Sequence, residues 1–225
     1  MVTGDNPWLR IPVADYESHM EAVGQTAALR QLFSSVYRNA EPRRLLVLGC
    51  TTGADFDGID PAVTDVAAGV DINRRYLEVA EARLAAIGRH VRLVCGDVLE
   101  VELPDAPFDL IHAALLLEYV DPVALFRRVH GWLAASGRFS VVIQEPVPDK
   151  PAVSTTRYES LQTLSGTMSL RSAPEVASLG SREGFFCESR LALELPSGKV
   201  LTQMLFRPAS AARSAAAAGE RASGN

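Results

Sequence analysis

The chain alternates between short, uninterrupted apolar runs and longer segments in which apolar residues recur every three or four positions. Strands buried on both faces have continuous apolar runs, whereas helices that cover a sheet have the longer spacing. We therefore predict parallel strands at residues 45–48, 66–70, 91–95, 109–114 and 138–144.

Helical segments fill the intervals between these runs. After the second strand Asn73 can cap a helix, and after the fourth strand Asp121 precedes Pro122, which suits the first helical position. Before the first strand, residues 26–38 have helical spacing, and Asp15 can cap a shorter turn. Strands that alternate with helices predict an α/β fold whose mostly parallel sheet is covered by helices on both faces.

The end of the chain has a different pattern. Apolar runs at residues 186–195 and 200–206 flank a Pro-Ser-Gly turn, and a helix is expected at residues 174–182 just before them. Two apolar runs around so short a turn predict a hairpin. We therefore expect a seven-stranded sheet that finishes with antiparallel pairing.

These elements divide the chain into three parts. Residues 1–40 are predicted to form a helical cap and residues 41–207 the α/β domain. Within the domain, residues 146–172 fit neither pattern, and a loop of this length favours a substrate lid. Residues 208–225 are nearly all Ala, Ser, Gly and Arg without an apolar stripe, which predicts a disordered tail.

Composition and charge narrow the possible partners. The 225 residues suffice for one domain with a full core, and their formal net charge of −5, with scattered basic residues, argues against binding to nucleic acid. A small molecule is the expected substrate. The N-terminus lacks a basic-then-apolar stretch, and the apolar runs are too short to cross a bilayer, so no membrane partner is expected. Three cysteines without paired spacing indicate reduced thiols and a cytoplasmic protein.

Candidate binding residues follow the predicted strands. In open parallel sheets, ligands bind outside the carboxyl ends of the strands. The first strand ends in a small-residue turn from Gly49 to Gly53, which lets a ligand approach the backbone. The second ends in Asp71, whose carboxylate suits two ribose hydroxyls; the third ends in Asp97, which with the amide of Val98 matches the edge of an adenine. Together they predict an adenosine site.

With these segments in this order, the sequence resembles the class I S-adenosylmethionine-dependent methyltransferases. The similarity covers residues 43–145 and lies in LLVLGCTTG, VDIN, CGDV, FDLIHAALLLEYV and LAASGRFSVVI. It implies a Rossmann-like fold, S-adenosylmethionine as cofactor and methyl transfer to a small-molecule acceptor. The cofactor-binding residues that it implies are Gly49, Cys50, Thr51, Gly53, Asp71, Ile72, Asp97, Val98, Ala113 and Leu115.

Two positions depart from the family's pattern. Val47 stands where the family usually carries an acid near the methionine end of the cofactor, and Thr51 replaces its middle glycine. Because a β-branched residue at positive φ is strained, we expect the turn around Thr51 to be reshaped. If the N-terminal segment folds over the site, Tyr16, His19 and Gln25 are candidates to hold the amino-acid moiety.

Methyl transfer by in-line displacement needs alignment, exclusion of water and, for some acceptors, a base. Tyr119, Glu145 and His112 lie near predicted strand ends and are the candidate catalytic bases. His112, inside an apolar strand, is also typical of a core histidine. The predicted lid, with Tyr158 and Met168, is expected to shape the acceptor pocket but indicates no particular acceptor.

Other functions stay open at this point. Val47 and Thr51 are also compatible with a catalytically inactive, methyltransferase-like protein that binds a nucleoside without turnover. An acid after the second strand also suits the ribose of NAD, although the turn lacks the G-x-G-x-x-G of dinucleotide-binding proteins. The oligomeric state is not indicated.

Several residues have simpler interpretations than chemistry. Cys50 is more typical of a small buried residue in a tight turn than of a nucleophile. Asp55, Asp57 and Asp60 are expected to be solvated acids near a helix start. The histidines have no metal-ligand spacing, so no metal is predicted.

Overall fold

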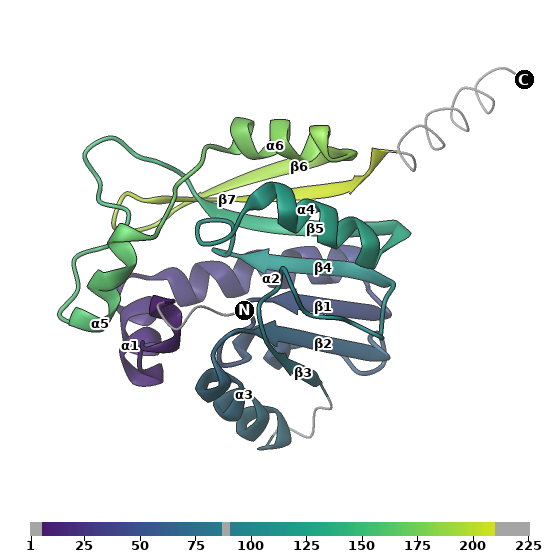
Figure 1. Ribbon diagram of the computed structural model, residues 1–225, viewed down its shortest axis with the longest axis horizontal. Helices are drawn as coiled ribbons and strands as arrows, with labels where there is room; N and C mark the ends of the chain where they lie inside the picture. Colours follow the sequence, from purple (N-terminus) through teal and green to yellow (C-terminus); the bar gives the residue numbers. More distant parts are fainter. Residues whose placement is uncertain (1–5, 87–90, 210–225) are drawn as a thin grey trace, which may run out of the picture.

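The computed structural model describes residues 6–86 and 91–209 (Figure 1). The strands are β1 (Arg44–Leu48), β2 (Val66–Asp71), β3 (Arg92–Cys95), β4 (Phe108–Ala114), β5 (Leu133–Gln144), β6 (Phe185–Glu194) and β7 (Val200–Pro208). The α-helices are α1 (Val13–Ala22), α2 (Gln25–Ala40), α3 (Arg74–Ala86), α4 (Pro122–Trp132), α5 (Glu159–Gln162) and α6 (Ala173–Arg182). Three short 3-10 helices complete the set: η1 (Pro7–Leu9), η2 (Ala54–Gly58) and η3 (Thr163–Gly166).

The strands form one seven-stranded sheet in the order β3-β2-β1-β4-β5-β7-β6. The first five strands along the chain pair in parallel, whereas β7 pairs antiparallel with both β5 and β6. The predicted mixed sheet with a terminal hairpin is confirmed. The strand order reverses between β1 and β4, and this is where ligands bind in sheets of this kind.

Helices cover both faces of the sheet, because side chains of each strand alternate between two cores. On β1, Leu46 and Leu48 lie in the core that contains Phe126 of α4. Leu45 and Val47 lie in the opposite core, where α2 and α3 pack. The second half of the predicted helical cap, residues 25–40, therefore forms a layer of the α/β domain. The described first half, η1 and α1, lies over the ends of the strands.

The predicted helix caps occur where expected. Asn73 Oδ1 accepts the N–H of Arg75 at 3.0 Å, and Asp121 Oδ1 accepts the N–H of Val123 at 2.9 Å. Each side chain satisfies a donor that the first helical turn leaves without a partner.

Some boundaries differ from the predicted ones. Asp15 lies inside α1, which begins after Pro12, because a proline needs no helical partner for its missing N–H. Strand β5 starts earlier than predicted, at Leu133. Strand β7 continues to Pro208, the first residue of the predicted tail; residues 210–225 of that tail lie outside the described residues.

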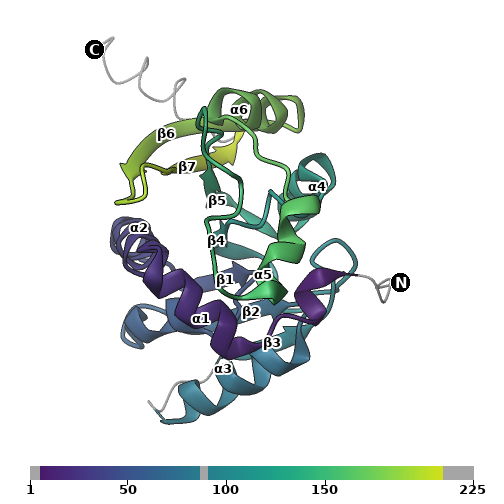
Figure 2. The same cartoon turned by 90° about the vertical axis from the view of Figure 1, so that its left-hand side faces the viewer.

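The helix α1 and the segment that contains α5 lie over the carboxyl ends of the parallel strands, as Figure 2 shows from that side. Ser160 Oγ donates to Asp15 Oδ2 at 2.7 Å and joins the two. The Asn73 side-chain amide donates to the Trp8 carbonyl at 2.7 Å and ties η1 to the end of β2. Among residues 6–86 and 91–209, no helix is both long enough and apolar enough to span a membrane.

Candidate active site

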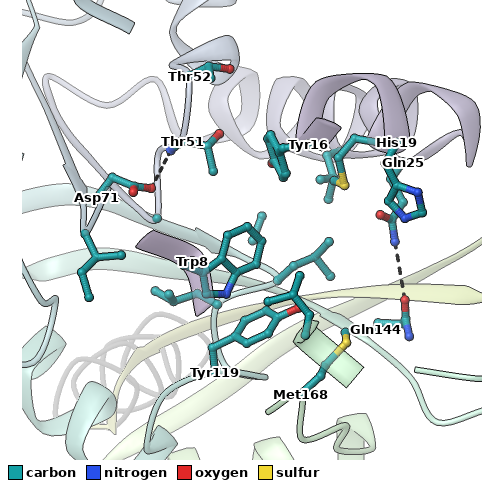
Figure 3. A pocket seen from close by; sticks show the side chains of 18 of the residues that line it. Trp8, Tyr16, His19, Gln25, Thr51, Thr52, Asp71, Tyr119, Gln144 and Met168 are labelled. Atoms are coloured by element: carbon teal, nitrogen blue, oxygen red, sulfur yellow. Dashed lines mark hydrogen bonds between the residues drawn. The ribbon is translucent and has the colours of Figure 1, made fainter. Parts of the chain in front are cut away.

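A cavity of about 550 Å³ lies between the strand ends and these covering segments (Figure 3). The carboxyl ends of β1 to β5 form its floor. Its other walls come from η1, α1, the first turns of α2, η2 and the segment between β5 and α6. The cavity thus occupies the place where the strand order favours a ligand.

Asp71 is the anchor of one end of the cavity. Its side chain is buried, with Oδ1 accepting the N–H of Asn73 at 2.8 Å and Oδ2 accepting the N–H of Thr51 at 2.9 Å. Each carboxylate oxygen can accept a second hydrogen bond. Burial raises the pKa of Asp71 to about 6, although both backbone donors act in the opposite direction. At neutral pH the group is an ionised acceptor with free capacity.

Two non-glycine residues on the cavity floor have left-handed backbone, Thr51 with φ 45° and Leu115 with φ 51°. This conformation costs an L-residue about 1–2 kcal/mol. The expectation that Thr51 forces a reshaped turn is therefore wrong: the turn keeps its left-handed residue. The reason lies in its contacts, because the Thr51 N–H donates to Asp71 and its side chain lies beside Tyr16 (Figure 3).

Asp97 lies beside Asp71 at the end of β3. Its Oδ1 accepts the N–H of Leu99 at 2.8 Å, and both Asp97 and Val98 line the cavity. In the described part of the chain the Val98 N–H donates to no protein atom. Asp97 and Val98 thus lie at the same part of the cavity wall, and their binding to the edge of an adenine stays a prediction.

Aromatic side chains fill the middle of the cavity wall. The Trp8 ring packs edge-on against Tyr119, with ring centroids 5.0 Å apart, and against Tyr16 at 6.0 Å (Figure 3). Burial raises the pKa of both tyrosines above the ordinary value, so both hydroxyls are protonated at neutral pH. Trp8 and Tyr119 are 111 positions apart in the sequence, and the fold alone brings them together.

Two further carboxylates line the cavity near the first loop, and the sequence analysis missed their role. Glu17 Oε1 accepts the Thr52 hydroxyl at 2.7 Å and pairs with Arg83 at 3.2 Å. Asp55 stands in the first turn of η2, as expected, but it is half-buried rather than exposed like Asp57 and Asp60, and burial raises its pKa to about 6. Both lie close to the loop after β1, the strand in which Val47 replaces the acid that is usual in the family.

A polar group lies at the other end of the cavity. Lys199, which directly precedes β7, is only 4% exposed; its ammonium donates to the Ala152 carbonyl at 2.7 Å and to Gln144 Oε1 at 3.4 Å. The Gln25 amide approaches the same oxygen at 3.5 Å. Burial lowers the pKa of Lys199 to about 8, and burial followed by the Lys199 charge lowers the pKa of His19. Sequence analysis missed Lys199 altogether.

The structure brings most of the predicted cofactor-binding residues to this cavity. Those that line it are Tyr16, Gly49, Thr51, Asp71, Ile72, Asp97, Val98 and Leu115. Cys50 and Ala113 point into the cores below the loop and the sheet. Gly53 lies behind the loop, where a Cβ would stand 3.0 Å from Ala80 Cβ of α3. These three shape the backbone without facing a ligand.

The three candidate bases are placed differently from one another. Tyr119 lines the cavity. His112 does not: it is 1% exposed in β4, its Nδ1 lies 3.0 Å from Ser140 Oγ, and burial lowers its pKa to about 4. Glu145 lies behind β5, where it accepts the Thr202 hydroxyl at 2.9 Å and the N–H of Ala173 at 3.1 Å. Strand position suggested both as bases, but the direction of each side chain removes it from the cavity.

Comparison with known proteins agrees with this geometry. A family model described as a methyltransferase domain matches residues 45–137, which span β1 to the first part of β5 and include Asp71 and Asp97. Over these residues the chain is therefore similar to a methyltransferase domain. No curated protein sequence matches the chain.

Solved structures share the fold at low sequence identity. The N-methyltransferase NodS from Bradyrhizobium japonicum, in complex with S-adenosyl-L-homocysteine, has a TM-score of 0.62 and 17% identity over 82% of this chain and 87% of that one. The mitomycin 7-O-methyltransferase MmcR has a TM-score of 0.64 and 18% identity over 91% of this chain and 61% of that one. The [4+2]-cyclase SpnF has a TM-score of 0.63 and 16% identity over 80% of this chain and 81% of that one. The methyltransferase domain thus has the Rossmann-like class I fold.

Proposed function

We propose that this protein transfers a methyl group from S-adenosylmethionine to a small-molecule acceptor. The observation that carries the proposal is the buried carboxylate of Asp71, which faces the cavity beside Asp97 and the free N–H of Val98. An ionised carboxylate with spare acceptor capacity suits the two hydroxyls of a ribose. Asp97 and Val98 suit the amino group and ring nitrogen of an adenine.

The amino-acid half of the cofactor needs acceptors for its ammonium group. Val47 is buried in the core below β1 and does not reach the cavity. Glu17 and Asp55 supply carboxylates instead, from α1 and η2. A sulfonium next to this site also gains from the aromatic faces of Trp8 and Tyr16, because ring faces attract cations. The residues present therefore fit the cofactor without the usual acid.

When bound, S-adenosylmethionine supplies an already activated methyl group. The protein then has to align the acceptor and exclude water. Trp8, Tyr119 and the lid residues close the cavity over the strand ends. Among the described residues that line the cavity, His19 is the histidine, and its lowered pKa keeps it neutral, so its imidazole can take a proton from an acceptor. Tyr119 stays protonated and can donate a hydrogen bond.

Calorimetry with S-adenosylhomocysteine tests the binding step. We expect micromolar affinity for the wild type, and a loss of about tenfold to a hundredfold in Asp71→Asn, because each hydrogen bond to a charged group contributes about 1.5–3 kcal/mol. Glu145→Gln is the matched control, since this carboxylate lies outside the cavity. Absence of binding to the wild type at millimolar ligand would reject the proposal.

A protein that binds the cofactor without transferring its methyl group is the second candidate. The strained Thr51 and the missing acid at Val47 favour it, and SpnF, a similar structure, is named as a cyclase. Incubation with methyl-labelled S-adenosylmethionine and a panel of small acceptors separates the two. Labelled product that disappears in Asp71→Asn supports methyl transfer; binding without any labelled product supports the second candidate.

A further inference from the structure

Lys199 is an unusual residue in this chain. Of the 22 basic residues only Lys150 and Lys199 are lysines; Lys150 is exposed, whereas Lys199 is buried at the end of the cavity. Among the residues that the structure describes, Lys199 forms no ion pair. A buried ammonium without a counter-ion is costly, so a cavity that keeps one is expected to receive a negative charge there.

The hydrogen bonds around Lys199 leave donors in excess. The Lys199 ammonium and the Gln25 amide both approach Gln144 Oε1, at the long distances of 3.4 and 3.5 Å. The Ala152 carbonyl accepts from Lys199 and also from the Gln144 amide, at 2.7 and 2.8 Å. Lys199 and Gln25 thus carry more N–H groups than these two oxygens can accept. An anionic oxygen between them would satisfy the surplus.

The surrounding charges favour an anion as well. The helix α2 starts at Gln25, after Gly24, and no side chain caps its N-terminal N–H groups. His19, which feels the Lys199 charge, is neutral. Glu118 is a buried carboxylate that accepts the backbone N–H of Gln144, but it does not line the cavity. No described carboxylate neutralises Lys199 from inside the cavity.

This end of the cavity is far from the nucleoside end. In the sheet, β1, β4 and β5 separate β2 from β7, a distance of roughly 19 Å at about 4.8 Å per strand. Between the two ends the cavity wall is largely apolar: Val153, Leu161 and Leu164 pack with Trp8 and Tyr119, and Leu29 and Met168 also line the cavity. A ligand here would combine an apolar body with a negatively charged oxygen group.

We propose that Lys199, Gln25 and Gln144 bind the carboxylate of the methyl acceptor, which is therefore an organic acid with an apolar body. This inference rests on the proposed function, because it assigns the far end of the cavity to the acceptor. Lys199 supplies the charge and Gln25 the second donor, while Gln144 holds both side chains in place. Methylation then occurs on another group of the acid, closer to the sulfonium.

The presence of only two lysines permits a direct test. In protein labelled with ¹³C-lysine, the two Cε resonances are assigned with Lys150→Met and Lys199→Met, and the protein is saturated with S-adenosylhomocysteine. Benzoate, 4-hydroxybenzoate and hexanoate are titrated in turn, each against its neutral amide. We expect at least one acid to shift the Lys199 signal and to bind at least tenfold more tightly than its amide. Lys150→Met should keep this preference and Lys199→Met should lose it.

Lys199 has no counter-ion, and its two acceptors keep the Gln144 and Gln25 amides as donors, so Lys199→Met leaves no buried charge unpaired and is expected to be as stable as the wild type. Equal affinity for acids and amides, no binding of any acid, or an unchanged preference in Lys199→Met would each overturn the inference. A tenfold loss of S-adenosylhomocysteine affinity in Lys199→Met would also overturn it, because Lys199 would then hold the cofactor's own carboxylate. If the wild type does not bind S-adenosylhomocysteine, the proposed function fails, and the same titration of the ligand-free protein still decides whether Lys199 binds acids.

Discussion

The carboxylate of Asp71 accepts the backbone N–H of Thr51 at 2.9 Å, and this bond ties the end of β2 to the loop after β1. The left-handed conformation of Thr51 turns its N–H toward Asp71, while its side chain lies beside Tyr16 of α1 (Figure 3). One strained residue therefore lies between Asp71, the proposed ribose acceptor, and the covering helix. The strain is offset by contacts that a glycine at this position would make only in part.

Replacement of Thr51 should show this strain. Thr51→Ala and Thr51→Gly both remove the side-chain hydroxyl beside Tyr16, but only glycine adopts a left-handed φ without cost. After allowance for the greater freedom of unfolded glycine, we expect Thr51→Gly to be more stable than Thr51→Ala by about 0.5–1 kcal/mol in urea unfolding.

Gly58 provides the control for this comparison. A Cβ at Gly58 would meet no atom within 4 Å, and its φ is not left-handed. Gly58→Ala should therefore raise the free energy of unfolding by about 0.4–1 kcal/mol. Equal stability of the two Thr51 variants, alongside this gain at Gly58, would show that Thr51 is not strained in solution.

The affinity for adenosine should depend on pH through Asp71. Its pKa of about 6 lies above the ordinary value of 3.8, so the carboxylate is ionised at pH 7 and largely protonated at pH 5. Ribose hydroxyls donate to the ionised form. We expect the affinity to be constant above pH 7 and to fall about tenfold per unit below pH 6, as linkage of one proton requires. Calorimetry from pH 5 to 8 measures this profile.

Two variants test whether Asp71 causes the pH dependence of the affinity for adenosine. Asp71→Asn should bind adenosine weakly at every pH, with a flat profile. Asp55→Asn should leave adenosine binding unchanged, because adenosine lacks the amino-acid half, but should weaken the binding of S-adenosylhomocysteine. A wild-type affinity for adenosine that is the same at pH 5 and pH 7 would contradict the role of Asp71.

Glu118 should make the protein less stable at alkaline pH. It is 3% exposed, its Oε2 has no hydrogen-bond partner, and burial raises its pKa from 4.5 to about 7. Between these values the folded state retains a proton that the unfolded state has lost, so stability falls as pH rises to about 7. Glu118→Gln should remove this fall and gain about 1–2 kcal/mol at pH 8 relative to pH 5.

The comparison for Glu118 is Glu102→Gln, at a side chain that is 87% exposed. We expect this variant to unfold with the same pH dependence as the wild type. Asp55 and Asp71 also have raised pKa values, both about 6, so a slope below pH 6 should persist in Glu118→Gln. Persistence of the slope between pH 6 and 7 in this variant would show that Glu118 is not responsible.

Local patterns made much of the fold predictable. The apolar runs gave the strands, and Asn73 and Asp121 marked helix starts because a cap acts on N–H groups within the next turn. Asp71 and Asp97 could be predicted as neighbours because parallel strands end at the same edge of a sheet. Each of these inferences depends either on contacts between residues close in sequence or on the order of the strands in the sheet.

The missed residues depend on tertiary contacts. Lys199 lies 55 positions from Gln144, and Gln25, which the sequence did suggest as a candidate, lies 119 positions from it. No local pattern links the three. The scarcity of lysine in an arginine-rich chain was the one available signal for Lys199. For His112 and Glu145, strand position was predicted well, but which way each side chain points depends on register and packing.

The bond between Asp15 and Ser160 should control the release of ligand. It joins α1 to α5, two segments that lie over the strand ends, and we expect a bound ligand to leave when these segments separate (Figure 2). Asp15→Ala and Ser160→Ala should each speed dissociation of S-adenosylhomocysteine about fivefold, since a partly exposed hydrogen bond to a carboxylate contributes about 1 kcal/mol. Trp8, which lines the cavity, provides the fluorescence signal for stopped-flow measurement.

The double variant distinguishes this bond from separate effects at the two positions. If Asp15 and Ser160 act through one another, the double variant should release ligand no faster than either single variant. Ser165→Ala is the matched control, because the Ser165 hydroxyl bonds to Gln162 within the same segment and does not reach α1. Multiplied effects in the double variant, or equal acceleration by Ser165→Ala, would mean that the segment opens without breaking the Asp15–Ser160 bond.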